Sequence, residues 1–295
     1  MTIRHMIEIT CDGDGCGCKG RIAADDLLPS PQWVHVPGEG ERDYCPTCAS
    51  KHKAQLPLTA KGRRIAVVFV SYLKVPEERL QDHFRWNKAA YESHGDRLRV
   101  YVVSDVEHDL PSYARVCVFP IDQLPLIRGQ RKFSLTKTKN FGNDAAIADG
   151  ADVVICTDVD IAFEPNQIGI IADVTDKIAN IPVYRLAPSY EKRVTGNLDH
   201  GCTGTVAMTA ANWQRIRFDE RCVGYGADDG ILLRDIQAAG LTVDRHVIVS
   251  HIAHVQGDLG RNPGSGASTC WGRSDGFNFD NFRENRKLHR LRGDK

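Results

Sequence analysis

The sequence lacks the features that mark membrane proteins and strongly charged binding proteins. No apolar run approaches the roughly 18 residues that a membrane-spanning helix requires, and residues 1–6 are too polar for a secretory signal. The formal net charge is +0, so any attraction to nucleic acid or membranes has to come from local patches. We therefore expect a cytoplasmic protein without a membrane partner.

Two nucleotide-binding motifs are also absent. No G-x-G-x-x-G follows the first strongly apolar run, at residues 65–70, and no G-x-x-x-x-G-K-[ST] occurs in the chain. The sequence therefore supports neither a dinucleotide cofactor nor a P-loop.

A regular alternation of strand and helix patterns is present instead. Apolar runs at 65–70, 98–103 and 153–157 alternate with helical patterns at 77–94 and 139–149. Such alternation predicts an α/β fold with a parallel sheet, and ligands of such sheets bind beyond the carboxyl ends of the strands. We place this α/β domain at residues 62–260.

Carboxylates follow two of the predicted strands. Asp105 follows the second run, and the third run ends in Asp158-Val159-Asp160. An Asp-x-Asp pair alone is weak evidence for a metal site, because such pairs often close a turn or cap a helix. The alternatives of a polar turn and a divalent metal site are both open at this point.

Further polar residues occur at the ends of later elements. The block Gly224-Tyr225-Gly226-Ala227-Asp228-Asp229 precedes a helical pattern, which would place both carboxylates at a helix N-terminus. A predicted strand at 247–255 carries His251 and His254. Each of these residues could equally be a helix cap or an ordinary core or surface histidine.

The order of these motifs resembles the catalytic region of GT-A glycosyltransferases. It is most similar to the beta-1,4-galactosyltransferases and the polypeptide N-acetylgalactosaminyltransferases, and the resemblance covers about residues 133–255. The matching motifs are Lys139-Asn140-Phe141-Gly142, Asp158-Val159-Asp160, Gly224-Tyr225-Gly226-Ala227-Asp228-Asp229, and His254 or His251. The resemblance implies a GT-A, Rossmann-like fold and a metal-dependent transfer of a sugar from a nucleotide sugar, most simply a UDP-sugar.

The resemblance also implies roles for the acidic residues. Asp160 would bind the catalytic Mn²⁺ or Mg²⁺, Asp158 would hold the ribose or the metal shell, and Asp105 would contact the base or ribose. Asp229 would act as the general base in an inverting transfer. Asp228 replaces the more usual Glu and would orient the acceptor.

The remaining implied contacts are with the donor and the metal. Lys139 and Asn140 would bind the nucleotide sugar. The metal-binding histidine would be His254 or His251, and the Mn²⁺ or Mg²⁺ would neutralise the departing diphosphate.

The first fifty residues are rich in cysteine. Cys11, Cys16, Cys45 and Cys48 could form a closed structural Zn²⁺ site, with Cys18 as a substitute for Cys16. The segment resembles the small zinc ribbons of bacterial and phage proteins, which favours a bacterial or phage-infected cell as its location. We place the zinc ribbon at residues 1–58 and a flexible loop with a basic segment at 261–295.

The acceptor and the enzyme class leave alternatives open. The ribbon and its basic flank favour DNA as a partner, with a hydroxylated base in phage-type DNA as acceptor, and a protein or a small molecule is the alternative. A haloacid-dehalogenase-type phosphatase also begins with Asp-x-Asp, but it normally has Thr where this chain has Ala162. The third alternative is a catalytically inactive nucleic-acid-binding protein.

Overall fold

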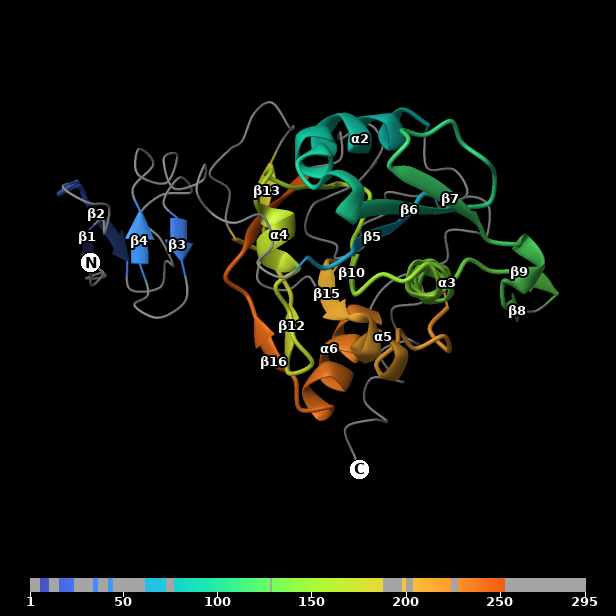
Figure 1. Cartoon of the computed structure of the whole chain (residues 1–295). Coiled ribbons are helices and arrows are strands. Elements are labelled where there is room, and N and C mark those ends of the chain that lie inside the picture. The colour runs from blue at the N-terminus through green and yellow to red at the C-terminus, as the bar shows by residue number, and fades with distance from the viewer. Residues whose placement is uncertain are drawn as a thin grey trace, which may run out of the picture. The chain divides into compact units, whose positions relative to one another are not determined.

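The computed structural model divides the chain into two compact units, Met1–Leu58 and Thr59–Lys295. We describe each unit by itself (Figure 1). The structure describes residues 6–10, 16–23, 34–36, 42–44, 62–72, 77–127, 129–187, 198–199, 204–223 and 228–252.

The first unit contains two short antiparallel hairpins. Strand β1 (Met6–Thr10) pairs with β2 (Lys19–Ala23), and β3 (Val34–Val36) pairs with β4 (Arg42–Tyr44). Cys16 is partly exposed and Cys18 is exposed, both just before β2. Cys11, Cys45 and Cys48 lie outside the described residues, so the zinc ribbon stays a prediction.

The second unit is built on a seven-stranded sheet in the order β16-β12-β15-β10-β5-β6-β7. Antiparallel pairing is confined to β15, which runs against both of its neighbours. The other pairs are parallel. The strands are β5 (Ile65–Val70), β6 (Leu98–Ser104), β7 (Ala114–Val118), β10 (Val153–Cys156), β12 (Ile178–Asn180), β15 (Val206–Thr209) and β16 (Thr242–Asp244).

Helices cover both faces of this sheet (Figure 1). The side chains of β5 alternate between two cores: Val68 packs with residues of α3, α5 and α6, and Val67 packs with residues of α2 and α4. Because both faces are covered, the central strands are apolar throughout, as the sequence predicts. The predicted α/β class is confirmed. The helices are α2 (Glu77–Glu92), α3 (Leu135–Ala148), α4 (Gln167–Ile171), α5 (Ala210–Arg215) and α6 (Asp228–Ala238).

Helix α3 approaches the sheet closely at Gly142. A methyl group at this position would overlap the side chains of Val103 on β6 and Val68 on β5. The glycine therefore lets α3 lie against the strands. Lys139, one turn earlier on the same helix, reaches Asp158 just after β10.

A second, four-stranded sheet has the order β11-β17-β13-β14. Its strands are β11 (Ile161–Ala162), β13 (Val183–Ala187), β14 (Leu198–Asp199) and β17 (Ile248–Ile252). The short elements β8 (Leu126–Ile127) and β9 (Gln130–Arg131) form a hairpin, and 3₁₀ turns occupy Gly95–Arg97 and Ile121–Gln123. Within the described ranges, no helix is long and apolar enough to cross a membrane.

Candidate active site

The candidate site lies where the strand order of the large sheet reverses. Strands β6 and β7 follow β5 in the sequence and lie in turn on one side of it. The chain then returns and places β10 on the other side of β5. In open α/β sheets, ligands bind beyond the carboxyl ends of the strands at such a switch point. Asp158 lies just beyond the carboxyl end of β10, at this point.

A buried lysine neutralises the first aspartate of the Asp-x-Asp pair. The Nζ atom of Lys139 on α3 lies 2.9 Å from Oδ1 of Asp158. Lys139 is buried, and its ammonium group also lies 5.2 Å from the centre of the Phe218 ring. Burial alone would lower the pKa of Lys139, but Asp158 and the acidic groups of Cys156, Asp229 and Asp228 hold it well above its usual range. The lysine is therefore a fixed positive charge.

The second aspartate meets a histidine from the other sheet. The Nε2 atom of His251 on β17 lies 3.2 Å from Oδ2 of Asp160. The contact follows from the backbone, because β11 begins directly after Asp160 and pairs Ile161 with His251. The Ile252 N–H also donates to the Asp160 carbonyl at 2.8 Å. A carboxylate and an imidazole about ninety positions apart thus converge, and His254 lies outside the described residues.

Asp228 and Asp229 occupy the first turn of α6. Asp228 is buried, and the Asp229 carboxyl is partly buried with its Oδ1 atom fully enclosed. Burial, followed by the charge of Asp228, raises the pKa of Asp229 to about 8, against the opposing charge of Lys139. The electrostatic interactions of Asp229 with Lys139 and Asp158 place the start of α6 at the same acidic centre.

The segment leading to this helix is anchored at the start of α3. The Ser134 hydroxyl caps α3 by accepting from the Lys137 N–H, and it donates to the Cys222 carbonyl at 3.1 Å. The Thr136 hydroxyl donates to the same carbonyl at 3.1 Å. Both hydroxyl groups are buried. They fix the chain two residues before the Gly224–Asp229 block, whose first four residues lie outside the described ranges.

Asp105 lies just beyond the carboxyl end of β6, separated from β10 by β5. Burial, the charge of Asp105 and the charge of Asp122 together raise the pKa of Tyr72 to about 12. Tyr72 follows β5, so Asp105 and Tyr72 share the carboxyl edge of the sheet. The loop after Asp105 is tied down by His108, which contacts Ser104 Oγ at 2.8 Å and Glu77 Oε2 at 3.0 Å.

The Glu77–His108–Ser104 chain has the order of a hydrolase triad. Ser104, however, is fully buried at the end of β6. A nucleophilic hydroxyl must reach its substrate, so these contacts hold the loop and do not indicate nucleophilic catalysis.

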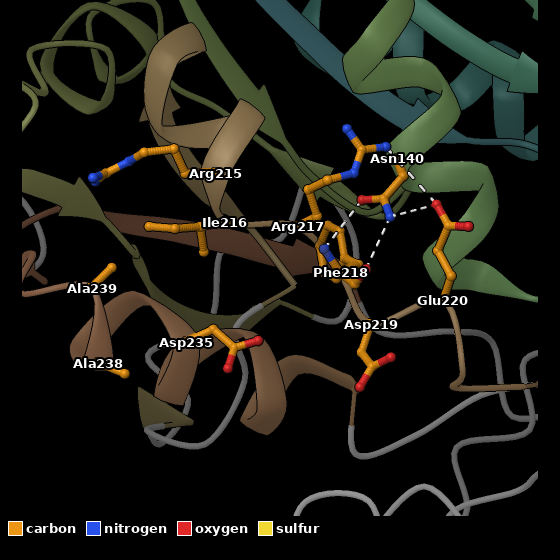
Figure 2. A pocket seen from close by; sticks show the side chains of 10 residues that line it. All are labelled: Asn140, Arg215, Ile216, Arg217, Phe218, Asp219, Glu220, Asp235, Ala238 and Ala239. Atoms are coloured by element: carbon orange, nitrogen blue, oxygen red, sulfur yellow. Dashed lines mark hydrogen bonds and ion pairs between the residues drawn. The ribbon is translucent and has the colours of Figure 1, made fainter. Parts of the chain in front are cut away.

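The hydrogen bonds of the Asn140 side chain go to the segment after α5, at Phe218 and Glu220. Its amide group donates to the Phe218 carbonyl at 2.9 Å and to Glu220 Oε1 at 3.0 Å, and its oxygen accepts from the Phe218 N–H at 3.1 Å. Figure 2 shows these contacts at the edge of a surface pocket of about 510 Å³, whose lining also includes Arg217 and Asp235. In the structure, Asn140 holds the segment after α5.

Sequence reasoning missed a set of buried polar side chains on α2. His83, Asn87 and Tyr91 recur every four residues and lie on one helix face, which is buried against residues 159–163. Burial lowers the pKa of His83 to about 4, so its imidazole is neutral. The four-residue spacing of His83, Asn87 and Tyr91 was the available signal.

The metal-ligand set is small within the described ranges. No group of three or more His, Cys, Asp or Glu side chains there could hold a metal ion. The Asp160–His251 pair supplies two potential ligands, and His254, the alternative histidine that the sequence suggests, lies outside those ranges.

Comparison with known proteins gives fold-level neighbours only. No family model matches the chain, and no curated protein matches it. Among solved structures, the catalytic domain of Drosophila beta1,4-galactosyltransferase 7 in complex with xylobiose is 16% identical, covers 68% of this chain and 76% of its own, and has a TM-score of 0.45. A mutant of that enzyme with manganese, UDP-Gal and xylobiose is also 16% identical, covering 71% and 77%, with a TM-score of 0.45. The mannosyltransferase PcManGT of Pyrobaculum calidifontis, with GDP-Man and Mn²⁺, is 16% identical and covers 66% and 58%, with a TM-score of 0.41.

Proposed function

We propose that this chain is a metal-dependent, inverting glycosyltransferase that uses a nucleotide sugar, preferably a UDP-sugar. The observation that carries the proposal is the Asp160–His251 contact of 3.2 Å, beside the buried Lys139–Asp158 ion pair, at the switch point of a parallel sheet. A carboxylate and an imidazole brought together beside a buried ion pair, at the edge where ligands of such sheets bind, support a functional site.

The donor chemistry of these residues fits Mn²⁺ or Mg²⁺. Carboxylate oxygen is the ligand that both ions prefer, and Asp160 provides it beside the imidazole of His251. We assign Asp160 and His251 as ligands, with His254 as the further candidate. The ion would neutralise the negative charge of the departing nucleoside diphosphate.

Two residues are assigned to the nucleotide sugar, and a third orients one of them. Asp158, anchored by Lys139, would accept a hydrogen bond from the ribose or from water around the metal. Asp105, at the end of β6, would contact the base or ribose. Lys139 is assigned to orienting Asp158, because its ammonium group is buried at 2.9 Å from that carboxylate.

The acceptor side is assigned to the start of α6. Asp229 would remove the proton from the acceptor hydroxyl as that oxygen attacks the sugar, and Asp228 would orient the acceptor. The favoured acceptor is a hydroxylated base in DNA. This choice is based only on the cysteine-rich segment and its basic flank. A base would have to be turned out of the duplex to reach Asp229.

The test is a donor screen in which nucleoside diphosphate release is measured with and without Mn²⁺. DNA carrying hydroxylated bases, a protein hydrolysate and simple glycosides serve as separate acceptors. We expect Mn²⁺-dependent release with one nucleotide sugar, and its loss in Asp160→Asn and His251→Gln. Asp96→Asn is the matched control. Asp96 is an exposed acid just before the amino end of β6, whereas the candidate site lies at the carboxyl ends of the strands.

The same screen separates the alternatives. A phosphatase would release inorganic phosphate from nucleotides without any acceptor. An inactive binding protein would bind DNA and release nothing from any donor. Full activity of Asp160→Asn would overturn the proposed function.

A further inference from the structure

Helix α2 supplies hydrogen bonds to the backbone that carries Asp160. His83 Nδ1 lies 2.8 Å from the carbonyl oxygen of Val159. Asn87 Nδ2 donates to the carbonyl of Ile161 at 2.9 Å, and Asn87 Oδ1 accepts from the N–H of Phe163 at 2.8 Å. Two side chains one helical turn apart therefore satisfy three alternating backbone groups, in a segment that passes from a turn at Val159 and Asp160 into β11.

These contacts replace a neighbouring strand. One edge of the segment pairs with β17, where Ala162 lies opposite Ser250. The other edge faces α2, whose His83 and Asn87 take the place of strand backbone. Buried backbone groups need such partners, because an unpaired one costs free energy comparable to a lost hydrogen bond. Trp86, between the two on α2, packs against Ala162 and Ile252.

Both peptide groups that flank Asp160 accept a hydrogen bond through their carbonyl oxygen, one from α2 and one from β17. The carbonyl before Asp160, that of Val159, accepts from His83, and the carbonyl of Asp160 itself accepts from the Ile252 N–H at 2.8 Å. Asp160 also lies in a turn that the Ile161 N–H closes by donating to the Asp158 carbonyl at 3.3 Å. The backbone angles of Asp160, and so the direction of its carboxylate, therefore depend on this turn together with the hydrogen bonds from His83 and Ile252.

The imidazole of His83 is itself oriented. A carbonyl oxygen can only accept, so Nδ1 of His83 must carry hydrogen. The Tyr91 hydroxyl lies 2.7 Å from Nε2 and donates to it, which selects that tautomer. The His83 ring is also packed against Phe69 of β5, with the ring centres 4.0 Å apart. Contacts with Tyr91 and Phe69 in the core therefore fix the direction in which His83 donates to Val159.

We propose that His83 and Asn87 are positioning residues that orient Asp160 for cation binding, with Tyr91 fixing the tautomer of His83. This inference rests on the proposed function, because it assigns Asp160 as a ligand. Removing the partners of a metal ligand typically lowers metal affinity about 10- to 100-fold. We expect a loss in this range when the hydrogen bond from His83 is removed.

The test compares four variants of buried groups on or next to α2. His83→Phe keeps a ring but removes the donor, and His83→Asn restores a donor near the position of Nδ1. His94→Phe is the matched control, because His94 is a buried histidine just after the same helix, and neither of its ring nitrogens is hydrogen-bonded to any described residue. Tyr91→Phe is a milder variant that leaves His83 in place.

Two measurements test whether Asp160 is correctly oriented: one of Mn²⁺ affinity and one of backbone opening at residues 158–163. The Kd for Mn²⁺ is obtained by titration, following free Mn²⁺ by electron paramagnetic resonance, with no donor present. Hydrogen exchange of the peptide that contains residues 158–163 is measured in the metal-free protein. Circular dichroism and thermal unfolding confirm that each variant is folded.

The expected result is a rise of about 10-fold or more in Kd, with faster exchange at 158–163, for His83→Phe. His83→Asn and Tyr91→Phe should show smaller changes, and His94→Phe should match the wild type in both measurements. A wild-type Kd and wild-type exchange in folded His83→Phe would overturn the proposal, and so would equal effects in His94→Phe.

Failure of the proposed function looks different. If the wild type binds no Mn²⁺, or if Asp160→Asn binds it as well as the wild type, the assignment of the metal site is wrong. If Asp160→Asn loses Mn²⁺ and His83→Phe keeps it, only the positioning role is wrong.

Discussion

The Nζ atom of Lys139 lies 2.9 Å from Oδ1 of Asp158, and the two side chains are 1% and 30% exposed. An ammonium group this deeply buried needs a partner, because its desolvation is costly unless it is paired. The pair links α3 to the end of β10 and sets the charge at the centre of the candidate site.

Replacing Lys139 by Met should destabilise the protein strongly. The change keeps an unbranched apolar chain, one atom shorter, but leaves Asp158 beside Asp228 and Asp229 without its cation. Breaking a buried pair typically costs 3–5 kcal/mol, and we expect about 3 kcal/mol because Asp158 keeps some contact with water. Urea denaturation measures the difference in free energy of unfolding.

The control for this prediction is Lys88→Met. Lys88 lies 3.8 Å from Glu92 in an exposed pair on α2. Exposed pairs of this spacing contribute only about 0.3–0.5 kcal/mol. Equal losses of free energy of unfolding in Lys88→Met and Lys139→Met would show that the buried pair stabilises the protein no more than an exposed one.

Replacing Gly142 by Ala should lower stability, although the same change usually strengthens a helix. Ala is favoured over Gly by about 1 kcal/mol inside a helix. Here the new methyl group would overlap Val103 and Val68, and overpacking of a core costs about 1–3 kcal/mol. We expect a net loss of about 1 kcal/mol in chemical denaturation. The double variant with Val103→Ala should lose less than the sum of its parts, because the second change makes room for the methyl group.

The strands could be predicted from the sequence because burial on both faces makes them apolar throughout. The same reasoning placed Asp105 and Asp158 at strand ends, since a carboxylate directly after such a run has few other places to lie. The spacing of His83 and Asn87 indicates that they share a helix face, but their burial and their backbone partners could not be predicted from it. Polar residues within a helix usually face solvent, and their burial here depends on a segment more than seventy residues later in the chain.

The contact partners of the site residues could not be predicted from the sequence either. The Lys139–Asp158 pair depends on how closely α3 lies on the sheet, and that distance is set by packing at Gly142. The choice between His251 and His254 depends on the register of β17 against β11, which the alternation of one short strand does not reveal.

Replacing Asn140 by Ala should affect folding more than donor binding. The change removes the partners of the N–H and the carbonyl of Phe218, and a buried group left unsatisfied costs about 1–3 kcal/mol. We expect a loss of about 2 kcal/mol in free energy of unfolding, with the donor KM within about twofold of the wild type. Asn140→Asp keeps the acceptor for the Phe218 N–H but places a carboxylate oxygen against the Phe218 carbonyl and Glu220, so it should lose at least as much. A large rise in donor KM at unchanged stability would instead support the donor contact that the sequence suggests.

The ionisation of Asp229 should be visible in both activity and stability. Burial and Asp228 raise its pKa to about 8, with Asp158 adding to the effect and Lys139 opposing it. A general base must be ionised, so kcat/KM should rise with pH up to about 8 and level off above it. Between pH about 4 and about 8 the folded protein keeps a proton that the unfolded chain loses, so the contribution of Asp229 to stability falls as the pH rises. Asp229→Asn should be inactive and should lack this part of the pH dependence when urea denaturation is repeated from pH 5 to pH 8.5. Identical pH slopes in the wild type and Asp229→Asn would contradict the raised pKa, and an active Asp229→Asn would remove the residue from the chemistry.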